Sequence, residues 1–578
     1  MDQLSATKTM GQADILPDMG ISQMATSITT RMNYNRINTV HVQYPARLDV
    51  DPITSVESGE ILPDTSGFPT RYEPPSVSFK TYRSVSNWGH KKIADYALQN
   101  RKRSFITPNY IWNGIMAFGG KCPPKTRLLS YEHAQNIIRA ALKVDDKIPI
   151  MGVMDSIEHI PRSTSPGLPW IVNVPGLKKR EILNRFLPSI VGYWRRVGAG
   201  LPVVPLPDCA AFARSHISTP DKNKVRPVWA YPLHAIVQES QFAAPLIHLF
   251  KNQEILPQMA YGMEMMKGGM TWLHFQAMRA RYFDPGCKFI MLDYSAFDSL
   301  VPAWLIRDSF KLLAEKFDFS HVNQGGNILP VDESHEKRKF KRMVDYFINT
   351  TIRNSDGRRF RKNHGVPFGS MFTNIIDTIV NLLVMYTICD CSLECTPIFE
   401  LAFGDEGLIC IPSSVLADVE CFSRVAKEIF GMVVSPTKSY ATTNLKNIRF
   451  FGYYNNNGSP IKDSIDLIAS MLYPQFLKDD WSYCISRALG CMLASAGSSS
   501  DVFLCGQAVW NYASRFPEVR GVELIRENPE LRRYLDQMGC SDLSLSHDFF
   551  FDINLLIPAW NCRKIQRNIQ LVRAPLMY

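Results

Sequence analysis

The stretch from Ile398 to Ile411 restricts the fold more than any other part of the sequence, because two apolar segments flank the tetrapeptide Phe403-Gly404-Asp405-Glu406. Apolar residues on both sides of a glycine, which permits a tight reversal, predict a β-hairpin with buried strands. Two adjacent carboxylates would then lie at its tip. Adjacent like charges repel each other unless a cation lies between them. The stretch therefore predicts either a charged turn or one half of a metal site.

A second acid follows a buried strand and could supply the other half. Residues 288–292 are largely apolar, Asp293 ends the run, and Pro302 marks the start of a helix after the next turn. Neighbouring antiparallel strands could bring Asp293 close to Asp405 and Glu406. Acids at the ends of two adjacent strands can hold two hard cations about 3.5–4 Å apart, which clamp the attacking and the leaving oxygen in phosphoryl or nucleotidyl transfer.

The charge balance favours a polyanionic partner without proving one. The 578 residues carry a formal net charge of +10, and 46% of them are hydrophobic, which is ordinary for a globular chain of several domains. The basic residues gather in clusters, some of them mixed with Phe, which suit phosphates and stacked bases better than an evenly charged surface would. These clusters are 177–180, 221–226, 336–342 and 357–362.

Cysteine usage and hydropathy indicate a soluble intracellular protein. The thirteen cysteines have no regular spacing, so free thiols in a reducing compartment are expected rather than a metal knuckle at Cys389, Cys391 and Cys395. Met1 to Ser5 has no signal-peptide pattern. The longest apolar stretch, Ile375 to Ile388, contains polar residues and is too short to span a bilayer.

Periodicity and turn residues predict the remaining elements. A helix at 414–430 would begin at an N-cap Ser414 and stop at Gly431, a loop is expected at 323–333, and Asp356-Gly357 carries a hairpin signal. Apolar spacing predicts further helices at about 131–142, 178–197, 334–351 and 371–388, and a largely helical region from about residue 463 onward.

Seven segments in order resemble the motifs of viral RNA-dependent RNA polymerases. Asp293-Tyr-Ser-Ala-Phe-Asp298 is similar to motif A, residues 365–381 to motif B, and Gly404-Asp405-Glu406 to motif C. The form of motif B, with Gly-Val-Pro before it and Asp377 and Asn381 within it, looks most like partitivirus-type polymerases of double-stranded-RNA viruses. The other matches are Pro436–Ser439 with motif D, Phe450–Tyr454 with motif E, Lys222–Pro227 with motif F and Thr164–Pro169 with motif G.

The resemblance implies roles for the acids and for one lysine. Asp293 and Asp405 would be the principal ligands of two Mg²⁺ or Mn²⁺ ions, and Glu406 would support the metal beside them. Lys438 would donate a proton to the leaving pyrophosphate. Alternatively, Lys438 is an ordinary solvated lysine.

The resemblance also implies which residues contact nucleotide and RNA. Asp298 would test the ribose 2′-hydroxyl, which is both donor and acceptor, unless it only caps the helix that starts at Pro302. Arg226 suits bidentate phosphate contact. The other residues implied for the nucleotide are Lys222, Lys224, Ser370, Thr373, Asp377 and Asn381, and those implied for RNA are Thr164, Ser165, Gly369 and Tyr453. Thr373 could instead be an ordinary helix residue, and Tyr453 could pack against a primer-side strand.

Two positions depart from the family pattern. Glu406 stands where the family usually has aspartate, and displacements near 1 Å can cost about a hundredfold in rate, although glutamate remains a hard oxygen ligand. Phe368 stands where the family usually has serine, and its ring could stack on a base. Neither departure touches Asp293 or Asp405, so an active enzyme is predicted.

These features predict an α+β fold: a right-hand polymerase with fingers, palm and thumb, whose palm is a small antiparallel sheet backed by helices. The predicted parts are an N-terminal arm at 1–76, fingers at 77–285 with motifs G and F, palm at 286–312 with motif A, a fingers insertion at 313–362, palm at 363–454 with motifs B to E, and a helical thumb and C-terminal region at 455–578.

The predicted function is template-directed RNA synthesis, for the transcription and replication of a viral, double-stranded RNA genome. The expected partners are RNA template and product, nucleoside triphosphates and a viral capsid protein, with no membrane, and the expected location is the virion interior or the host cytoplasm. One rival is a catalytically weakened RNA-binding or capsid-scaffold protein, for which Glu406 would be the sign. The other is a reverse transcriptase, against which Asp298 argues, because a deoxynucleotide user gains nothing from reading the 2′-hydroxyl.

Overall fold

The computed structural model describes residues 59–516 except 71, 127, 253, 264, 266–267, 417 and 476–479. All described residues belong to one compact unit that begins at Val50. Most of the predicted N-terminal arm and the part of the predicted C-terminal region beyond residue 516 lie outside the described residues.

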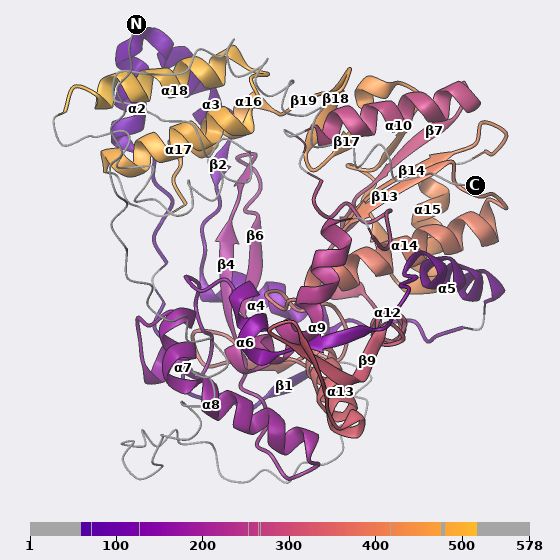
Figure 1. Ribbon diagram of the computed structural model, residues 1–578. Coiled ribbons are helices and arrows are strands. Elements are labelled where there is room, and N and C mark those ends of the chain that lie inside the picture. Colours follow the sequence, from indigo (N-terminus) through magenta and orange to yellow (C-terminus); the bar gives the residue numbers. More distant parts are fainter. Residues whose placement is uncertain are drawn as a thin grey trace, which may run out of the picture. The chain divides into compact units, whose positions relative to one another are not determined.

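A four-stranded antiparallel sheet forms the palm, with the strand order β13-β14-β7-β16 (Figure 1). These strands are β7 (Lys288–Leu292), β13 (Phe399–Phe403), β14 (Glu406–Ile411) and β16 (Tyr440–Thr442). Both faces of β7 and β14 are buried, which is why the sequence reads there as continuous apolar runs. The predicted hairpin is confirmed, since Phe403 pairs with Glu406 across the turn.

Helices cover both faces of this sheet. Side chains alternate along a strand, so Phe289 and Met291 pack toward α10 (Gly269–Phe283), whereas Ile290 and Leu292 pack into the core that contains α14 (Thr373–Ser392). The predicted antiparallel palm sheet backed by helices is therefore confirmed.

The helix α14 is longer than the apolar stretch expected from the sequence. Among the described residues it alone is long and apolar enough to cross a membrane by length and composition. However, 83% of its apolar window is buried inside the protein. Its hydrophobicity is accounted for by its place in the core, where α5 (Leu129–Ala141) and α12 (Ala303–Ala314) pack against it.

The other large sheet has the order β1-β12-β11-β4-β6; four of its strands lie in the regions predicted as fingers, and the edge strand β1 comes from the predicted N-terminal arm. The hairpin predicted at Asp356-Gly357 joins β11 to β12 and is confirmed. The strands are β1 (Glu60–Leu62), β4 (Cys209–Ser215), β6 (Val225–Ala230), β11 (Thr351–Arg353) and β12 (Arg359–Arg361), and the nearby elements include α4 (Pro108–Met116), α6 (Val153–Ser156), α7 (Trp170–Asn173), α8 (Lys179–Gly198), α9 (Leu233–Lys251) and α13 (Glu333–Ile348).

Two local predictions are wrong. The loop expected at 323–333 contains the hairpin of β9 (Phe317–Gln324) and β10 (Asn327–Pro330), because Gly325 and Gly326 both adopt positive φ and allow a tight turn. All four residues of β10 are exposed, so the strand lacks the apolar alternation that would have revealed it.

The second wrong prediction is the start of the helix that follows the hairpin of β13 and β14. The helix begins with α15 (Val419–Val425), where Asp418, not Ser414, is the N-cap and accepts a hydrogen bond from the Cys421 N–H at 2.8 Å. The predicted stop at Gly431 is confirmed, since Gly431 has φ of 70°.

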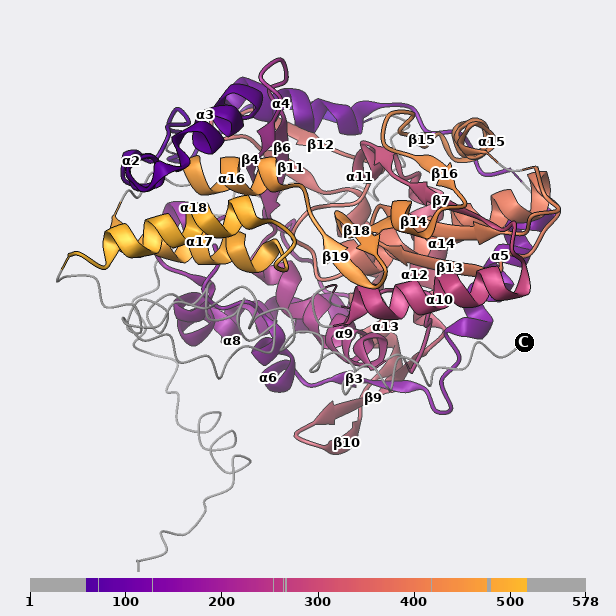
Figure 2. The ribbon, with the colours of Figure 1, turned by 90° about the horizontal axis from the view of Figure 1, so that it is seen from above.

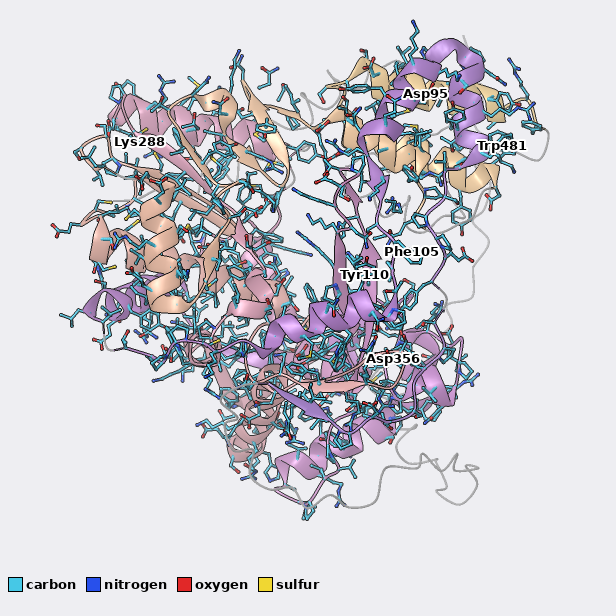
Figure 3. The ribbon with its side chains drawn as sticks, turned by 180° about the vertical axis from the view of Figure 1, so that it is seen from behind. Asp95, Phe105, Tyr110, Lys288, Asp356 and Trp481 are labelled. Atoms are coloured by element: carbon cyan, nitrogen blue, oxygen red, sulfur yellow. The ribbon has the colours of Figure 1, made fainter. Side chains whose placement is uncertain are left out.

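The C-terminal helices pack with the first helices of the described chain. Figures 1 and 2 show α2 (Phe79–Val85) and α3 (Lys91–Asn100) beside α16 (Ser464–Leu472), α17 (Trp481–Ala494) and α18 (Ser500–Ala513). They share one apolar cluster. Figure 3 shows Asp95 of α3 and Trp481 of α17 in the same group of helices. The predicted domain boundaries stay predictions. The shared apolar cluster shows, however, that residues 79–100, predicted as part of the fingers, pack against the helices of the predicted thumb.

The chain then passes from this helical group toward the fingers through a short basic strand. Arg101 forms an ion pair of 2.5 Å with Asp466, and Arg103 donates to the carbonyl oxygen of Tyr473. The strand β2 (Lys102–Arg103) pairs with β5 (Ile217–Ser218). Residues 101–103 therefore connect the helical group to the strands that lead into motif F.

We expect Leu472→Ala to destabilise this helical group. Leu472 is fully buried, so truncation leaves a cavity that should cost about 2–5 kcal/mol. Leu416, whose side chain is 93% exposed, provides the matched control Leu416→Ala. Urea unfolding followed by circular dichroism measures both, and equal midpoints for the two variants would contradict the packing described.

Candidate active site

The palm sheet brings Asp293 and Asp405 to the same end of two paired strands. Leu292, the last residue of β7, pairs with Gly407 of β14. Asp293 therefore lies next to the hairpin tip that carries Asp405 and Glu406. This register agrees with the sequence-based prediction that adjacent antiparallel strands unite the three acids.

Two side chains of helix α14 hold the backbone at the tip of the hairpin of β13 and β14. Gly404 has φ of 61°, and its N–H donates to Thr378 Oγ1 at 2.8 Å while its carbonyl accepts from Asn381 Nδ2 at 3.0 Å. A Cβ at position 404 would also lie 3.2 Å from the amide nitrogen of Asn374. The position therefore needs glycine, and the acids are carried on a rigid turn.

Asn381 lies inside the protein. Its side chain is fully buried, and it accepts a hydrogen bond from the Tyr294 hydroxyl at 3.3 Å in addition to its bond to Gly404. Its predicted contact with the nucleotide stays a prediction, and the observed contacts orient motif C instead.

Lys438 is held against Asp293. Its Nζ lies 2.6 Å from Asp293 Oδ1, so it is not the freely solvated lysine of the alternative interpretation. The next residue, Ser439, accepts a hydrogen bond from the Asp293 N–H at 2.9 Å. Motif D thus meets motif A directly, and the role of Lys438 as proton donor stays a prediction.

Burial raises the pKa of the Asp405 carboxyl, and the nearby Asp293 raises it further, while Arg226 and Lys438 oppose the rise. Burial also raises the pKa of Glu406, with smaller contributions from Asp405 and Asp293, against the lowering effect of the Phe451 N–H. Burial therefore disfavours the charged form of both carboxyl groups at the tip, a cost that a bound cation would relieve.

Two residues of the predicted motif F lie close enough to these acids to interact with them electrostatically. Lys224 has a lowered pKa, because partial desolvation and the cations Arg226 and Lys438 outweigh the attraction of Asp293 and Asp405. Lys222 is exposed at the turn between β5 and β6. A group of cations facing two carboxylates suits a triphosphate that brings its own metal ions.

Several residues of the clusters at 336–342 and 357–362 form ion pairs within the protein, while the interpretation of the basic clusters as phosphate-binding stays a prediction. Arg359 forms an ion pair with Asp208, Lys339 with Glu336, and Lys337 with Glu333. Sequence composition could not reveal this, because the acid that pairs with Arg359 lies about 150 residues earlier in the chain.

Asp298 and Asp377 form a buried pair of carboxyl groups. Burial and the nearby Asp405 raise the pKa of Asp298 to about 6. The pKa of Asp377 is raised well above its usual value, by burial first and then by Asp298. Asp298 lies in α11 (Phe297–Leu300), whereas Pro302 is the N-cap of α12, so the helix-cap alternative for Asp298 is excluded.

The loop of motif B rests on a buried glutamate that the sequence interpretation missed. Glu239 of α9 has no exposed surface, and its Oε2 accepts from Ser370 Oγ and from the Met371 N–H, both at 2.8 Å. Ser370, predicted to contact the nucleotide, is therefore engaged with Glu239. A lone acid in the apolar stretch of α9 was the available signal.

A buried lysine anchors the other end of the same loop. Lys362 has no exposed surface, and its Nζ donates to the carbonyl oxygens of Phe347, Ile348 and Gly365 at 2.6 to 2.8 Å. Two of these carbonyls end helix α13, where a cation is favoured. The interpretation of Lys362 as a phosphate-binding residue is wrong for this reason.

The remaining motif B residues also contact the loop itself. Thr373 Oγ1 donates to the carbonyl of Pro367 at 2.7 Å, which favours the structural alternative for its hydroxyl. Gly369 has φ of 81°, and a Cβ there would lie 2.7 Å from the Trp229 carbonyl. Phe368 packs edge-on against Trp229, with ring centroids 5.7 Å apart. Its contact with a base stays a prediction.

The residues outside motif B that are predicted to contact RNA differ in exposure: Tyr453 is buried, whereas Thr164 is exposed. The Tyr453 hydroxyl donates to the carbonyl of Ala494 in the helix α17 at 2.9 Å, so its observed hydrogen bond is made within the protein. Thr164 is exposed, and Ser165 Oγ accepts from the Gly167 N–H at 3.3 Å. The roles of these residues in RNA binding stay predictions.

Comparison with known proteins identifies the family. A profile described as viral RNA-dependent RNA polymerase matches residues 126–466. The chain belongs to this family, and the resemblance noted in the motifs is confirmed.

Proteins similar to this chain include the RNA-directed RNA polymerases of three viruses. That of Atkinsonella hypoxylon virus is 27% identical over 52% of this chain and 50% of its own length, and that of Cryptosporidium parvum virus 1 is 27% identical over 69% and 76%. That of white clover cryptic virus 1 is 22% identical over 50% and 49%. The match thus spans about half the length of two of these relatives.

A solved structure shows the same fold. The Sicinivirus 3Dpol RNA dependent RNA polymerase superposes with a TM-score of 0.59 at 14% identity, covering 88% of this chain and all of that chain. The predicted right-hand α+β fold is confirmed.

The acids of the site suit a divalent metal ion. The described residues contain no group of three or more His, Cys, Asp or Glu placed to hold a metal by themselves. Mg²⁺ is commonly held by one or two carboxylates together with substrate phosphates. Asp293 and Asp405 form an oxygen-only pair at the ends of adjacent strands and fit ions of that kind, with the triphosphate supplying further ligands.

We expect the stability of the protein to depend on the ionisation of Glu239. Burial raises the pKa of Glu239 from an ordinary value near 4.5 to about 7, so the folded state holds this proton more tightly than the unfolded chain. The resulting stability is fully present below about pH 4.5 and is lost as the pH rises to about 7, a change of about 1–3 kcal/mol.

Chemical denaturation at pH 5, 6, 7 and 8 tests this dependence. Glu239→Gln removes the titration, so its unfolding free energy should fall less than that of the wild type between pH 5 and 8. The exposed Glu420 provides the matched control Glu420→Gln, which should keep the wild-type slope. Parallel curves for the wild type and Glu239→Gln would rule out the raised pKa.

Proposed function

We propose that this chain catalyses template-directed RNA synthesis, adding nucleoside monophosphates from triphosphates to the 3′-hydroxyl of an RNA strand. The observation that carries the proposal is the meeting of Asp293 and Asp405 at the ends of β7 and β14. Lys224, Arg226 and Lys438 interact with these acids, so the position carries charges of both signs. Membership of the polymerase family supports the same activity.

Each residue has a proposed task. Asp293 and Asp405 hold divalent ions, Mg²⁺ or Mn²⁺, which when bound stabilise the charge on the attacking and leaving oxygens. Lys222, Lys224 and Arg226 bind and orient the triphosphate. Lys438 leaves Asp293 to provide a proton to the pyrophosphate. Asp298 and Asp377 together bind the ribose 2′-hydroxyl, as an acceptor and a donor side by side.

The biological setting is part of the proposal. The form of motif B supports a viral double-stranded RNA genome as the template that is copied. A capsid protein as partner, and a place in the virion interior and the host cytoplasm, rest on the same resemblance. The proposal includes no membrane partner.

The first test compares Asp405→Asn with the wild type in primer-independent extension on an RNA template, with Mg²⁺ or Mn²⁺. Incorporation of ribonucleotides should fall by about a thousandfold or more, because the metal-binding carboxylate is lost. The exposed Asp64 provides the control Asp64→Asn, which should keep wild-type incorporation. Incorporation of deoxynucleotides alone would identify a reverse transcriptase, and RNA binding without incorporation would identify a non-catalytic protein.

A second test concerns sugar selection. Asp298→Ala should lower the preference for ribonucleotides over deoxynucleotides at least about tenfold, because a group that pairs with the 2′-hydroxyl is removed. Asp298→Asn keeps a donor and an acceptor and should retain more of the preference. The outcome that contradicts this role is a lower rate of incorporation with an unchanged ratio of kcat/KM for ribonucleotides to kcat/KM for deoxynucleotides. Asp298 would then only support the local structure.

A further inference from the structure

Glu406 does not extend only toward the catalytic acids. It is the first residue of β14, and its Oε2 accepts a hydrogen bond from the Phe451 N–H at 2.6 Å. Phe451 lies 45 residues later, in the turn between β17 (Arg449–Phe450) and β18 (Tyr453–Asn456). The glutamate side chain therefore joins the catalytic hairpin to the segment that resembles motif E.

The turn that receives this bond has an unfavourable backbone conformation. Phe451 has φ of 53°, in the left-handed region that residues other than glycine rarely adopt, and Gly452 follows with φ of 72°. The Phe451 ring packs at right angles on Phe403, with centroids 5.0 Å apart. The conformation thus depends on neighbours in the catalytic hairpin, through one ring contact and one hydrogen bond.

The turn also determines the position of an exposed basic and aromatic pair. Arg449 and Tyr454 face each other across β17 and β18, with the guanidinium 5.7 Å from the ring centroid, and 42% of Tyr454 is exposed. On the same strand, Tyr453 is bonded to Ala494 of α17. A guanidinium beside an exposed ring suits the backbone and base of a nucleic acid strand.

Side-chain length explains why glutamate stands at this position. An aspartate on the same strand would be one methylene shorter, about 1.5 Å, and its oxygen would no longer reach the Phe451 N–H. Glutamine would have the same length, and its amide oxygen could accept the same bond.

We propose that Glu406 is a positioning residue: its carboxylate fixes the turn at Phe451 against the catalytic hairpin, and so places Arg449 and Tyr454 to bind an RNA strand. This inference rests on the proposed function, since it assigns a task within RNA synthesis. It differs from the expectation that Glu406 is a metal ligand, and the two assignments predict opposite effects for two substitutions.

The test compares Glu406→Gln with Glu406→Asp in the full chain, using a primed RNA hairpin and Mn²⁺ as probes. In E406Q, the Kd for the primed RNA should stay within about twofold of the wild-type value. In E406D, it should rise about tenfold, because the Phe451 N–H loses its hydrogen-bond acceptor. The Kd for Mn²⁺, measured by titration without RNA, should be the same in both variants.

Hydrogen exchange gives a second readout that does not depend on catalysis. The backbone N–H groups of residues 450–454 should exchange faster in E406D than in E406Q. Phe403→Leu keeps Glu406 and removes the ring contact with Phe451, so it should also speed exchange and weaken RNA binding, which keeps the proposal testable if E406D does not fold.

The opposite pattern would overturn the proposal. The proposal is wrong if E406Q weakens Mn²⁺ binding while E406D retains it. It is also wrong if the two substitutions change the RNA affinity by the same factor, or if neither changes it. The proposed function is tested separately, by the extension assay with Asp405→Asn. The role of Glu406 is tested by RNA affinity, Mn²⁺ affinity and hydrogen exchange, which can all be measured on a protein that makes no RNA, so the two failures can be told apart.

Discussion

The rest of the site depends on holding carboxylates close together at the end of a buried sheet, against their mutual repulsion. Asp405 gains protons more readily than a free aspartate because burial and Asp293 disfavour its charge. The protein meets this cost with fixed geometry. Thr378 and Asn381 bond the backbone of Gly404, so the carboxylate side chains at the tip stay free of α14.

Motif B uses buried charge in a different way. Glu239 and Lys362 hold the two ends of one loop, each with its polar atoms directed at backbone groups or a hydroxyl. Removing Glu239 would leave the Met371 N–H and the Ser370 hydroxyl without their acceptor, and removing Lys362 would leave three carbonyl oxygens without their donor, so these anchors make the loop conformation specific. The loop that faces the nucleotide in the proposed function is therefore fixed from behind.

The sequence revealed the elements whose signals are local. The apolar runs around Gly404 and before Asp293 predicted the two central palm strands, and the order of the motifs indicated the fold. It could not reveal which basic residues remain free, because the partner of Arg359 is Asp208, far away in the chain. It also could not show that Glu406 bonds Phe451, since only the folded register brings those residues together. The strand β10 escaped prediction because no face of it is buried.

The helical group of α2, α3 and α16–α18 has a consequence for how the chain is made. Ser78 contacts Cys484, which lies 406 residues later, and the Ser78 N–H donates to the carbonyl of Leu472. Domains generally fold as units during synthesis, from the N-terminus onward. Here the apolar faces of α2 and α3 pack against α16, α17 and α18, which the ribosome produces more than 350 residues later. The first described helices are thus synthesised long before the helices that bury them, so their apolar faces stay exposed while the palm and fingers are made.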